Sequence, residues 1–167
     1  MISIRPRDPE DLDGCVEVLA RVHAADGYPA AWPDDPGRWL MPSRLLGAWV
    51  AGRAGALVGH VGLSGASPGP SAEYWSASTG LPPDRLGAVR QLFVAPDARG
   101  DGLGERLLSH ATAAALRQGL HPVLDVIEKN RTATALYERL GWRVVGAIDV
   151  KFGGRPERLV CYVAPCA

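Results

Sequence analysis

Lysine, net charge and long apolar runs are what this sequence most clearly lacks. Only two of its eighteen basic residues are lysines, and eighteen acidic residues balance them. A neutral chain lacks the basic excess of a general nucleic-acid binder, so we expect no nucleic-acid partner. No apolar run reaches the roughly eighteen residues of a membrane-spanning helix, and the first residues have no apolar core of signal-peptide length. These absences predict a soluble, cytoplasmic protein with no membrane partner.

Cysteine is also scarce. The three copies, Cys15, Cys161 and Cys166, have no metal-ligand spacing and leave an odd number for pairing. Cys15 falls on the apolar face of an expected helix, where a buried free thiol is the favoured interpretation. We therefore expect no metal site.

What the chain does contain is the composition of one globular domain. Its 167 residues are 47% apolar, which is enough for a sizeable core, and we expect a single domain over residues 1–167. Helical spacing of apolar residues begins after Asp8, after Gly104 and after Asn130. Strand patterns cover residues 2–6, 88–96, 122–128, 143–150 and 158–164, with a hairpin that turns at residues 52–55. This mixture predicts an α+β (mixed α/β) domain around one central mixed sheet.

Two segments look irregular. Residues 26–39 hold three prolines and three aromatic residues, and only Pro36 is placed to start a short helix. Residues 65–84 are rich in glycine, proline and serine, and we expect a long ordered loop there, of the kind that often carries function.

A glycine-rich stretch, Arg99-Gly100-Asp101-Gly102-Leu103-Gly104, comes immediately before the best apolar helix pattern. Glu105 stands where a dinucleotide fingerprint needs its third glycine, and Gly104-Glu105-Arg106 is not the Gly-Lys-Ser/Thr of a P-loop. Free N–H groups at a helix start favour an anion such as a pyrophosphate, and glycines let it approach the backbone. The same residues also suit a sharp strand-to-helix turn, so the stretch alone leaves both interpretations open.

The context of this stretch resembles the GCN5-related N-acetyltransferase (GNAT) family. Its hexapeptide matches the Arg/Gln-x-x-Gly-x-Gly/Ala signature, and "VRQLFVAPDARGDGLGERLL" is similar to the family's strand–loop–helix segment. "NRTATALYERLGWRVVG" resembles the second signature, and the order of elements fits over nearly the whole chain. The resemblance implies a central mixed, mostly antiparallel twisted sheet flanked by helices, with a splayed strand pair that holds acyl-CoA.

The resemblance also implies an enzyme that uses acetyl-CoA, with its cofactor-binding residues on one strand and in the glycine loop. The strand would pair with the pantetheine arm, the Val94 N–H would polarise the thioester carbonyl, and the loop would hold the pyrophosphate. Asn130 would hydrogen-bond the pantetheine, cap its helix, or both. The implied cofactor-binding residues are Leu92, Phe93, Val94, Arg99, Gly100, Asp101, Gly102, Leu103, Gly104 and Asn130.

Tyr137 matches the family's general acid, which protonates the departing thiolate; without the resemblance, a packed helix tyrosine would be favoured. Many family members carry a glutamate on the strand before the glycine loop, but residues 86–94 hold no carboxylate. We name no general base; the candidates, each of which also suits an ordinary surface or strand position, are His60, Glu73, Asp26 and His23.

Aromatic residues in the two irregular segments are the expected walls of the acceptor site. We expect Tyr28, Trp32, Tyr74 and Trp75 to contact the acceptor, whereas Trp39, flanked by apolar residues, is better placed to anchor its segment to the core. Such walls favour a small-molecule primary amine with a flat or apolar body. A protein or peptide amine and a degenerate acyl-CoA-binding module stay open as alternatives, and so do a monomer and a homodimer.

Overall fold

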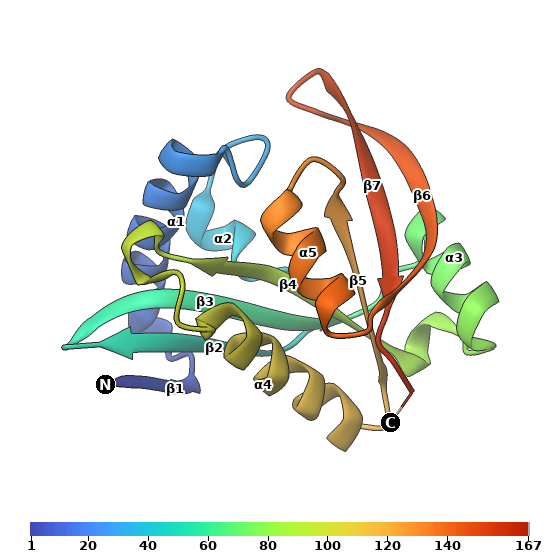
Figure 1. The fold of residues 1–167 in the computed structure, drawn as a ribbon, viewed down its shortest axis with the longest axis horizontal. Helices are drawn as coiled ribbons and strands as arrows, with labels where there is room; N and C mark the ends of the chain where they lie inside the picture. Colours follow the sequence, from blue (N-terminus) through green and yellow to red (C-terminus); the bar gives the residue numbers. More distant parts are fainter. Residues whose placement is uncertain (167) are drawn as a thin grey trace. The chain divides into compact units, whose positions relative to one another are not determined.

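The computed structural model describes residues 1–166, and these fall into two compact units. Unit 1 contains residues 1–64 and 89–114, and unit 2 contains residues 65–88 and those from 115 onward. Strands are neighbours in the order β1-β2-β3-β4-β5-β7-β6, and β4 takes part in both units (Figure 1). The single domain expected over residues 1–167 stays a prediction.

Unit 1 is built on the antiparallel strands β1 (Ile2–Pro6), β2 (Leu45–Arg53) and β3 (Ala56–Gly65), with most of β4 (Leu86–Val94). Its helical elements are η1 (Pro9–Asp11), α1 (Leu12–Asp26), α2 (Pro36–Trp39), η3 (Pro96–Ala98) and most of α4 (Leu103–Arg117). The apolar face expected for α1 is confirmed, since Cys15, Leu19 and Val22 are buried. Burial raises the pKa of the Cys15 thiol to about 11.

Unit 2 pairs the start of β4 with β5 (His121–Ile127) in parallel, and β5 with β7 (Arg155–Val163) antiparallel. β6 (Arg143–Phe152) pairs antiparallel with β7, and Figure 1 shows the two as a long hairpin. The remaining elements are α3 (Pro70–Thr79), η2 (Pro83–Arg85) and α5 (Arg131–Arg139). One parallel pair among antiparallel pairs confirms the expected α+β fold with a mixed, mostly antiparallel sheet.

The long loop expected over residues 65–84 is wrong, because its middle forms helix α3. Pro70 occupies the first turn, where its missing N–H costs nothing, and Gly80 ends the helix with a left-handed φ of 72°. In sequence, proline and glycine are typical of loops, but they are also start and stop signals of a helix. The helix is held by packing, which the local composition does not reveal.

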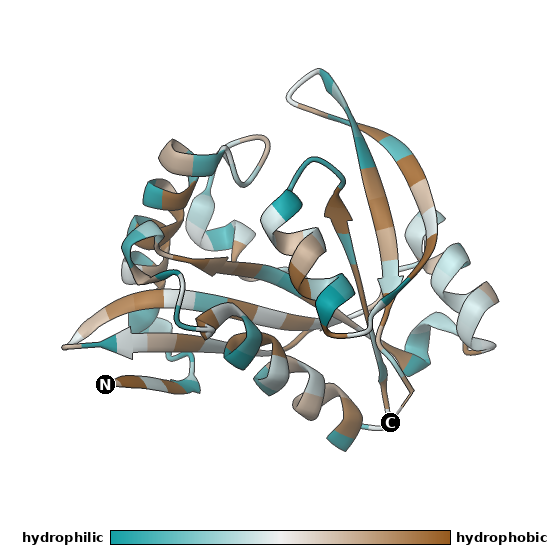
Figure 2. Ribbon diagram, viewed as in Figure 1, coloured by the Kyte–Doolittle hydropathy of each residue, from teal (hydrophilic) through white to brown (hydrophobic). Residues whose placement is uncertain are grey.

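Trp75 on α3 belongs to the core of unit 2. It is 5% exposed and packs in a cluster with Ala72, Leu86, Val123 and Cys161, and its indole N–H donates to the Leu124 carbonyl at 3.2 Å. Apolar residues that recur along β5 and β7 supply the same core (Figure 2). The structure thus places Trp75 in a core, and the acceptor contact expected for it stays a prediction.

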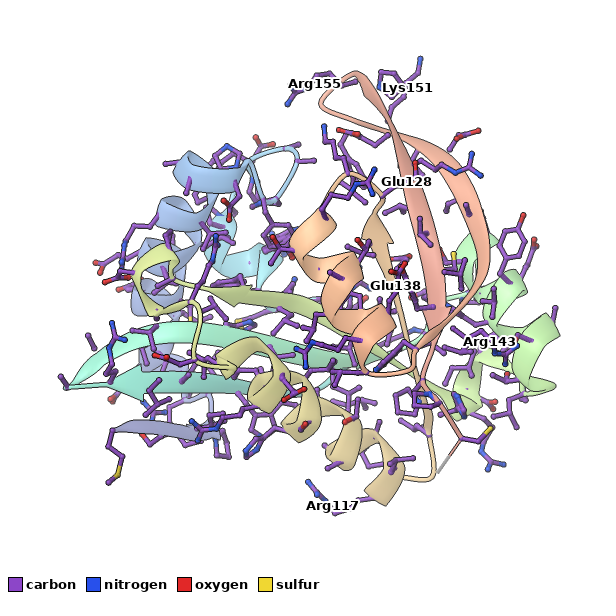
Figure 3. All side chains as sticks on the ribbon, viewed as in Figure 1. Arg117, Glu128, Glu138, Arg143, Lys151 and Arg155 are labelled. Carbon is purple, nitrogen blue, oxygen red and sulfur yellow. The ribbon has the colours of Figure 1, made fainter. Side chains whose placement is uncertain are left out.

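Tyr74, the neighbour of Trp75, lies on the surface with 40% of its area exposed. Its ring covers Gly146 of β6, where a Cβ would overlap the ring atoms. Arg143, labelled beside α3 in Figure 3, donates to Ser78 Oγ at 3.2 Å. Tyr74 and Arg143 therefore help to seat α3 on β6.

Replacing Trp75 with alanine should destabilise the protein by about 3–5 kcal/mol, because a buried indole and its hydrogen bond are both lost. Replacing Glu73, which is exposed on the same helix, should change stability by no more than about 0.5 kcal/mol. Urea denaturation followed by fluorescence measures both. Equal stabilities for the two variants would contradict a core role for Trp75.

Candidate functional site

The glycine loop occupies the turn between η3 and α4 in unit 1. Gly100 and Gly102 have left-handed φ values of 98° and 75°, and a Cβ on either residue would meet no atom within 4 Å. The left-handed conformation explains why glycine occupies both positions. The open space beside them leaves the backbone at these two residues uncovered. Helix geometry leaves the N–H groups of Leu103 and Gly104 without an acceptor within α4. The loop therefore makes the sharp turn, and it leaves open space beside Gly100 and Gly102; anion binding by the loop stays a prediction.

Arg99 is the exposed cation of this loop. Its Nε donates to the Val94 carbonyl at 3.2 Å, and its Nη2 lies 2.5 Å from Asp26 Oδ2 at the end of α1. Asp97 of η3 makes a similar ion pair with Arg21 of α1. The loop is thus held against α1 by two ion pairs, and Asp26, a candidate general base, is engaged with a cation.

The strand residues expected to bind the cofactor lie in β4. Leu92 and Val94 are half-buried and Phe93 is buried, with its ring stacked on His60 at a centroid distance of 5.0 Å. β4 pairs with β5 where Leu86–Ala88 lie opposite His121–Val123. A gap between the two strands beyond these residues stays a prediction.

His60, which the sequence suggests only as a possible general base, is fully buried in β3. Its Nδ1 lies 2.9 Å from the Gln91 carbonyl, and its Nε2 lies 2.9 Å from Arg7 Nη1. A carbonyl only accepts and a guanidinium only donates, so Nδ1 carries the proton and Nε2 accepts. Burial, aided by the Arg7 charge, lowers the pKa of His60 to about 4. The ring is a neutral bridge with both nitrogens occupied.

Gln91 is the residue that the sequence analysis missed. It lies in β4 with a left-handed φ of 55°, it is 9% exposed, and its Nε2 donates to the Trp39 carbonyl at 2.6 Å. No signal of residue type or spacing marks such a strand position. Its hydrogen bond to Trp39 crosses 52 residues of sequence, so only the fold reveals it.

The aromatic residues of segment 26–39 partly gather near β4. The Tyr28 ring lies 6.2 Å from that of Trp39, edge to face, and 6.4 Å from that of Phe93. Trp32 is 40% exposed and its ring lies 5.2 Å from that of His23, whose Nδ1 is 2.9 Å from the Pro29 carbonyl. Pro36 begins the short helix α2, as expected. The structure thus places Tyr28 near both Trp39 and Phe93, and it places Trp32 beside His23.

In unit 2, Asn130 caps α5, because its side chain accepts from the Ala133 N–H at 3.3 Å. Tyr137 is 6% exposed on the same helix, with its ring centroid 5.9 Å from that of Trp142 and 5.6 Å from that of Tyr162. Burial raises the pKa of Tyr137 well above its usual value, with Tyr162 and Asp125 acting in the same direction. The phenol therefore keeps its proton at neutral pH. Glu73, the last candidate base, is exposed on α3.

Residues 1–166 contain no group of three His, Cys, Asp or Glu side chains that could hold a metal ion. None of the described helices is long and apolar enough to cross a membrane.

The chain matches a known protein family. The model of the acetyltransferase (GNAT) family matches residues 17–142. Peptidyl-lysine N-acetyltransferase YjaB of Salmonella typhimurium is 36% identical over 74 residues, which are 44% of this chain and 48% of that protein. Mycothiol acetyltransferase of Geodermatophilus obscurus is 29% identical over 153 residues, which are 87% of this chain and 45% of that protein. The chain thus spans about half the length of the curated relatives it matches.

The fold has relatives among solved structures. Arabidopsis thaliana NAA60 in complex with acetyl-CoA superposes with a TM-score of 0.73 and 20% identity, over 98% of this chain and 97% of that one. At this identity the likeness concerns the fold.

The buried, neutral His60 generates a pH prediction. Its folded pKa of about 4 lies below the usual value of 6.5, so between these pH values the unfolded chain binds a proton that the folded chain does not. This contribution to stability is present above pH 6.5 and declines as the pH falls toward 4, by about 3 kcal/mol in all. Denaturant midpoints measured from pH 7 to pH 4 should show the decline.

A His60→Gln variant should lose this part of the pH dependence while being less stable at pH 7. His110 is exposed on α4, and His110→Gln leaves the buried imidazole in place, so the wild-type decline should persist. A wild-type decline in His60→Gln would show that other groups cause it.

Proposed function

The chain belongs to the acetyltransferase (GNAT) family, whose model matches residues 17–142, and we propose that it transfers the acetyl group of acetyl-CoA to a primary amine of a small molecule. The acceptor would attack the thioester directly while both substrates are bound. This makes the chain an acetyl-CoA-dependent N-acetyltransferase. The observation that carries the proposal is the open glycine loop with Arg99 at the start of α4.

The glycine loop suits the pyrophosphate of coenzyme A. Gly100 and Gly102 leave open space above the backbone, so phosphate oxygens can reach main-chain N–H groups at the positive end of the helix dipole. Arg99 supplies a forked cation that suits phosphate geometry. The full proposed set is Leu92, Phe93, Val94, Arg99, Gly100, Asp101, Gly102, Leu103, Gly104 and Asn130.

The thioester end would be handled by β4 and α5. Residues 92–94 would pair with the pantetheine arm as an added strand, and the Val94 N–H would donate to the carbonyl oxygen as charge develops on it. Asn130 caps α5 with its side-chain oxygen, which leaves its amide N–H groups to donate to the pantetheine. When the C–S bond breaks, the electron pair stays on sulfur, and Tyr137 would donate its proton to that thiolate.

No side chain is assigned as the general base. Asp26 pairs with Arg99, and both nitrogens of His60 are engaged, with the pKa of the ring lowered to about 4. An acceptor amine that arrives neutral needs no base before it attacks, and water can take the proton that it sheds afterwards.

A second candidate acceptor is a lysine side chain of a protein. The observation that favours it is the 36% identity over 74 residues to a peptidyl-lysine N-acetyltransferase. Both candidates use the same attack by a primary amine. The aromatic ring of Tyr28, which lies near those of Trp39 and Phe93, favours the small-molecule acceptor, because flat apolar walls suit a flat apolar body.

Coenzyme A should stabilise the protein through the glycine loop. Gly102→Ala places a methyl group where the pyrophosphate must lie and should abolish the rise in melting temperature caused by coenzyme A. Gly119→Ala is the matched control: Gly119 follows the other end of α4, has φ 73° and likewise meets no atom within 4 Å. Both substitutions impose the same backbone strain, so only the ligand response should differ. Normal ligand stabilisation of Gly102→Ala would remove the loop from the cofactor site.

Tyr137→Phe removes one proton and keeps the ring. With an amine that the wild type acetylates, drawn from a panel of aromatic amines, alkylamines and lysine peptides, turnover should fall about 100-fold while coenzyme A binding holds. Release of free thiol from acetyl-CoA measures turnover. Tyr162→Phe is the control, since Tyr162 is a buried neighbour whose hydroxyl lies 3.5 Å from Glu138. Unchanged turnover in Tyr137→Phe would exclude the acid role, and a wild type inert toward the whole panel would overturn the proposed function.

A further inference from the structure

The side-chain oxygen of Gln91 is a buried acceptor that lacks a hydrogen bond. The amide nitrogen must face the Trp39 carbonyl, 2.6 Å away, because a carbonyl cannot pair with another oxygen. This fixes the orientation of the amide and directs Oε1 elsewhere. Within residues 1–166, Oε1 has no hydrogen-bond partner. A buried polar atom in this condition costs stability, so a native structure that keeps one calls for a reason.

The backbone at Gln91 is strained as well. A φ of 55° is rare for a residue with a Cβ, and such conformations gather at sites of binding and catalysis. The main chain at this point is held by the Gln91 carbonyl, which accepts the Nδ1–H of His60 at 2.9 Å. Backbone and side chain are therefore both fixed, and the direction of Oε1 is set before any ligand arrives.

The neighbours of Oε1 do not supply a donor. The two nitrogens of His60 are occupied by Gln91's own carbonyl and by Arg7. Arg7 Nη1 also donates to the Leu40 carbonyl at 2.8 Å. On β3, a Cβ at Gly62 would stand 3.5 Å from Oε1, so the glycine there leaves room for a small group.

The residue that holds the Gln91 amide belongs to a group of aromatic side chains. Trp39, whose carbonyl holds the Gln91 amide, packs edge to face with Tyr28, and Tyr28 also lies near Phe93 of β4. An unpaired acceptor on a side chain held by this aromatic group suits a ligand that carries an N–H donor on an apolar body. It does not suit a carboxylate or a phosphate, which would present a second acceptor to Oε1.

We propose that Gln91 Oε1 accepts a hydrogen bond from an N–H of the acceptor amine and so positions the amine for attack. The inference rests on the proposed function and deepens it by naming a residue that recognises the acceptor. Gln91 holds the amine and takes no proton from it, because an amide is not a base at neutral pH. One N–H directed at Oε1 restricts the rotation of the amino group and therefore the direction of its lone pair.

The test compares Gln91→Met with Gln91→Glu in the full chain, using an amine that the wild type acetylates. Methionine removes both the amide donor and the acceptor oxygen, so the KM for the amine should rise about tenfold or more. Glutamate loses the donor to Trp39, which loosens its orientation, but it keeps an acceptor oxygen, so its KM for the amine should rise clearly less than that of Gln91→Met. The KM for acetyl-CoA should not change in either variant.

The outcomes separate a positioning role from a structural one. If both variants raise the KM of the amine equally, the amide acts only by holding Trp39, and the inference is overturned. If Gln91→Met leaves it unchanged, Oε1 binds only solvent, and the inference is overturned too. Ser76→Ala, which removes another buried and unpaired oxygen, should leave both constants unaltered; an equal rise in that control would make the effect unspecific and would also overturn it.

The experiment distinguishes failure of the proposed function from failure of this inference. A wild type that transfers acetyl to no amine removes the function and the inference together. An active wild type with Gln91→Met kinetics like its own removes the inference alone.

Discussion

The neutrality of one buried imidazole is the constraint on which the interior of unit 1 depends. His60 donates through Nδ1 to the Gln91 carbonyl and accepts through Nε2 from Arg7, and it can do both only as one tautomer of the uncharged ring. Arg7 in turn holds the Leu40 carbonyl after α2, and Gln91 holds the Trp39 carbonyl within it. β3, β4, α2 and the end of β1 are thus linked through a ring that must stay neutral, and Phe93 stacks on its face.

Much of the fold could be predicted from the sequence, because local signals agreed with tertiary packing. Pro36 and Asn130 start helices as their residue types predict, and the apolar spacing after Gly104 matches the buried face of α4. α3 was missed because its Pro, Gly and Ser content favours a loop when packing is ignored. Tertiary burial of Trp75 and Ala72 supplies the stability that local propensity lacks.

The candidate site also has one part that the sequence predicts and one part that it does not. The glycine loop and the cap of α5 are short-range features with fixed spacing, so the sequence contains them. The buried acceptor of Gln91 is different: it depends on a bend in β4, a neutral tautomer in β3 and a carbonyl in α2. Each of these is set by partners at least 31 residues away in the chain, where residue type alone carries no information.

The ion pair between Arg99 and Asp26 has a consequence for how readily the loop can exchange anions. The two side chains are 36% and 42% exposed, so water and salt screen their attraction and the pair contributes about 1 kcal/mol at most. If a dianion replaced the carboxylate, the protein would lose little interaction energy from the broken ion pair, and Arg99 would face two negative charges instead of one. In the proposed function, Asp26 would act as a weak internal counterion that keeps the guanidinium oriented before the anion binds and releases it at a small cost in free energy.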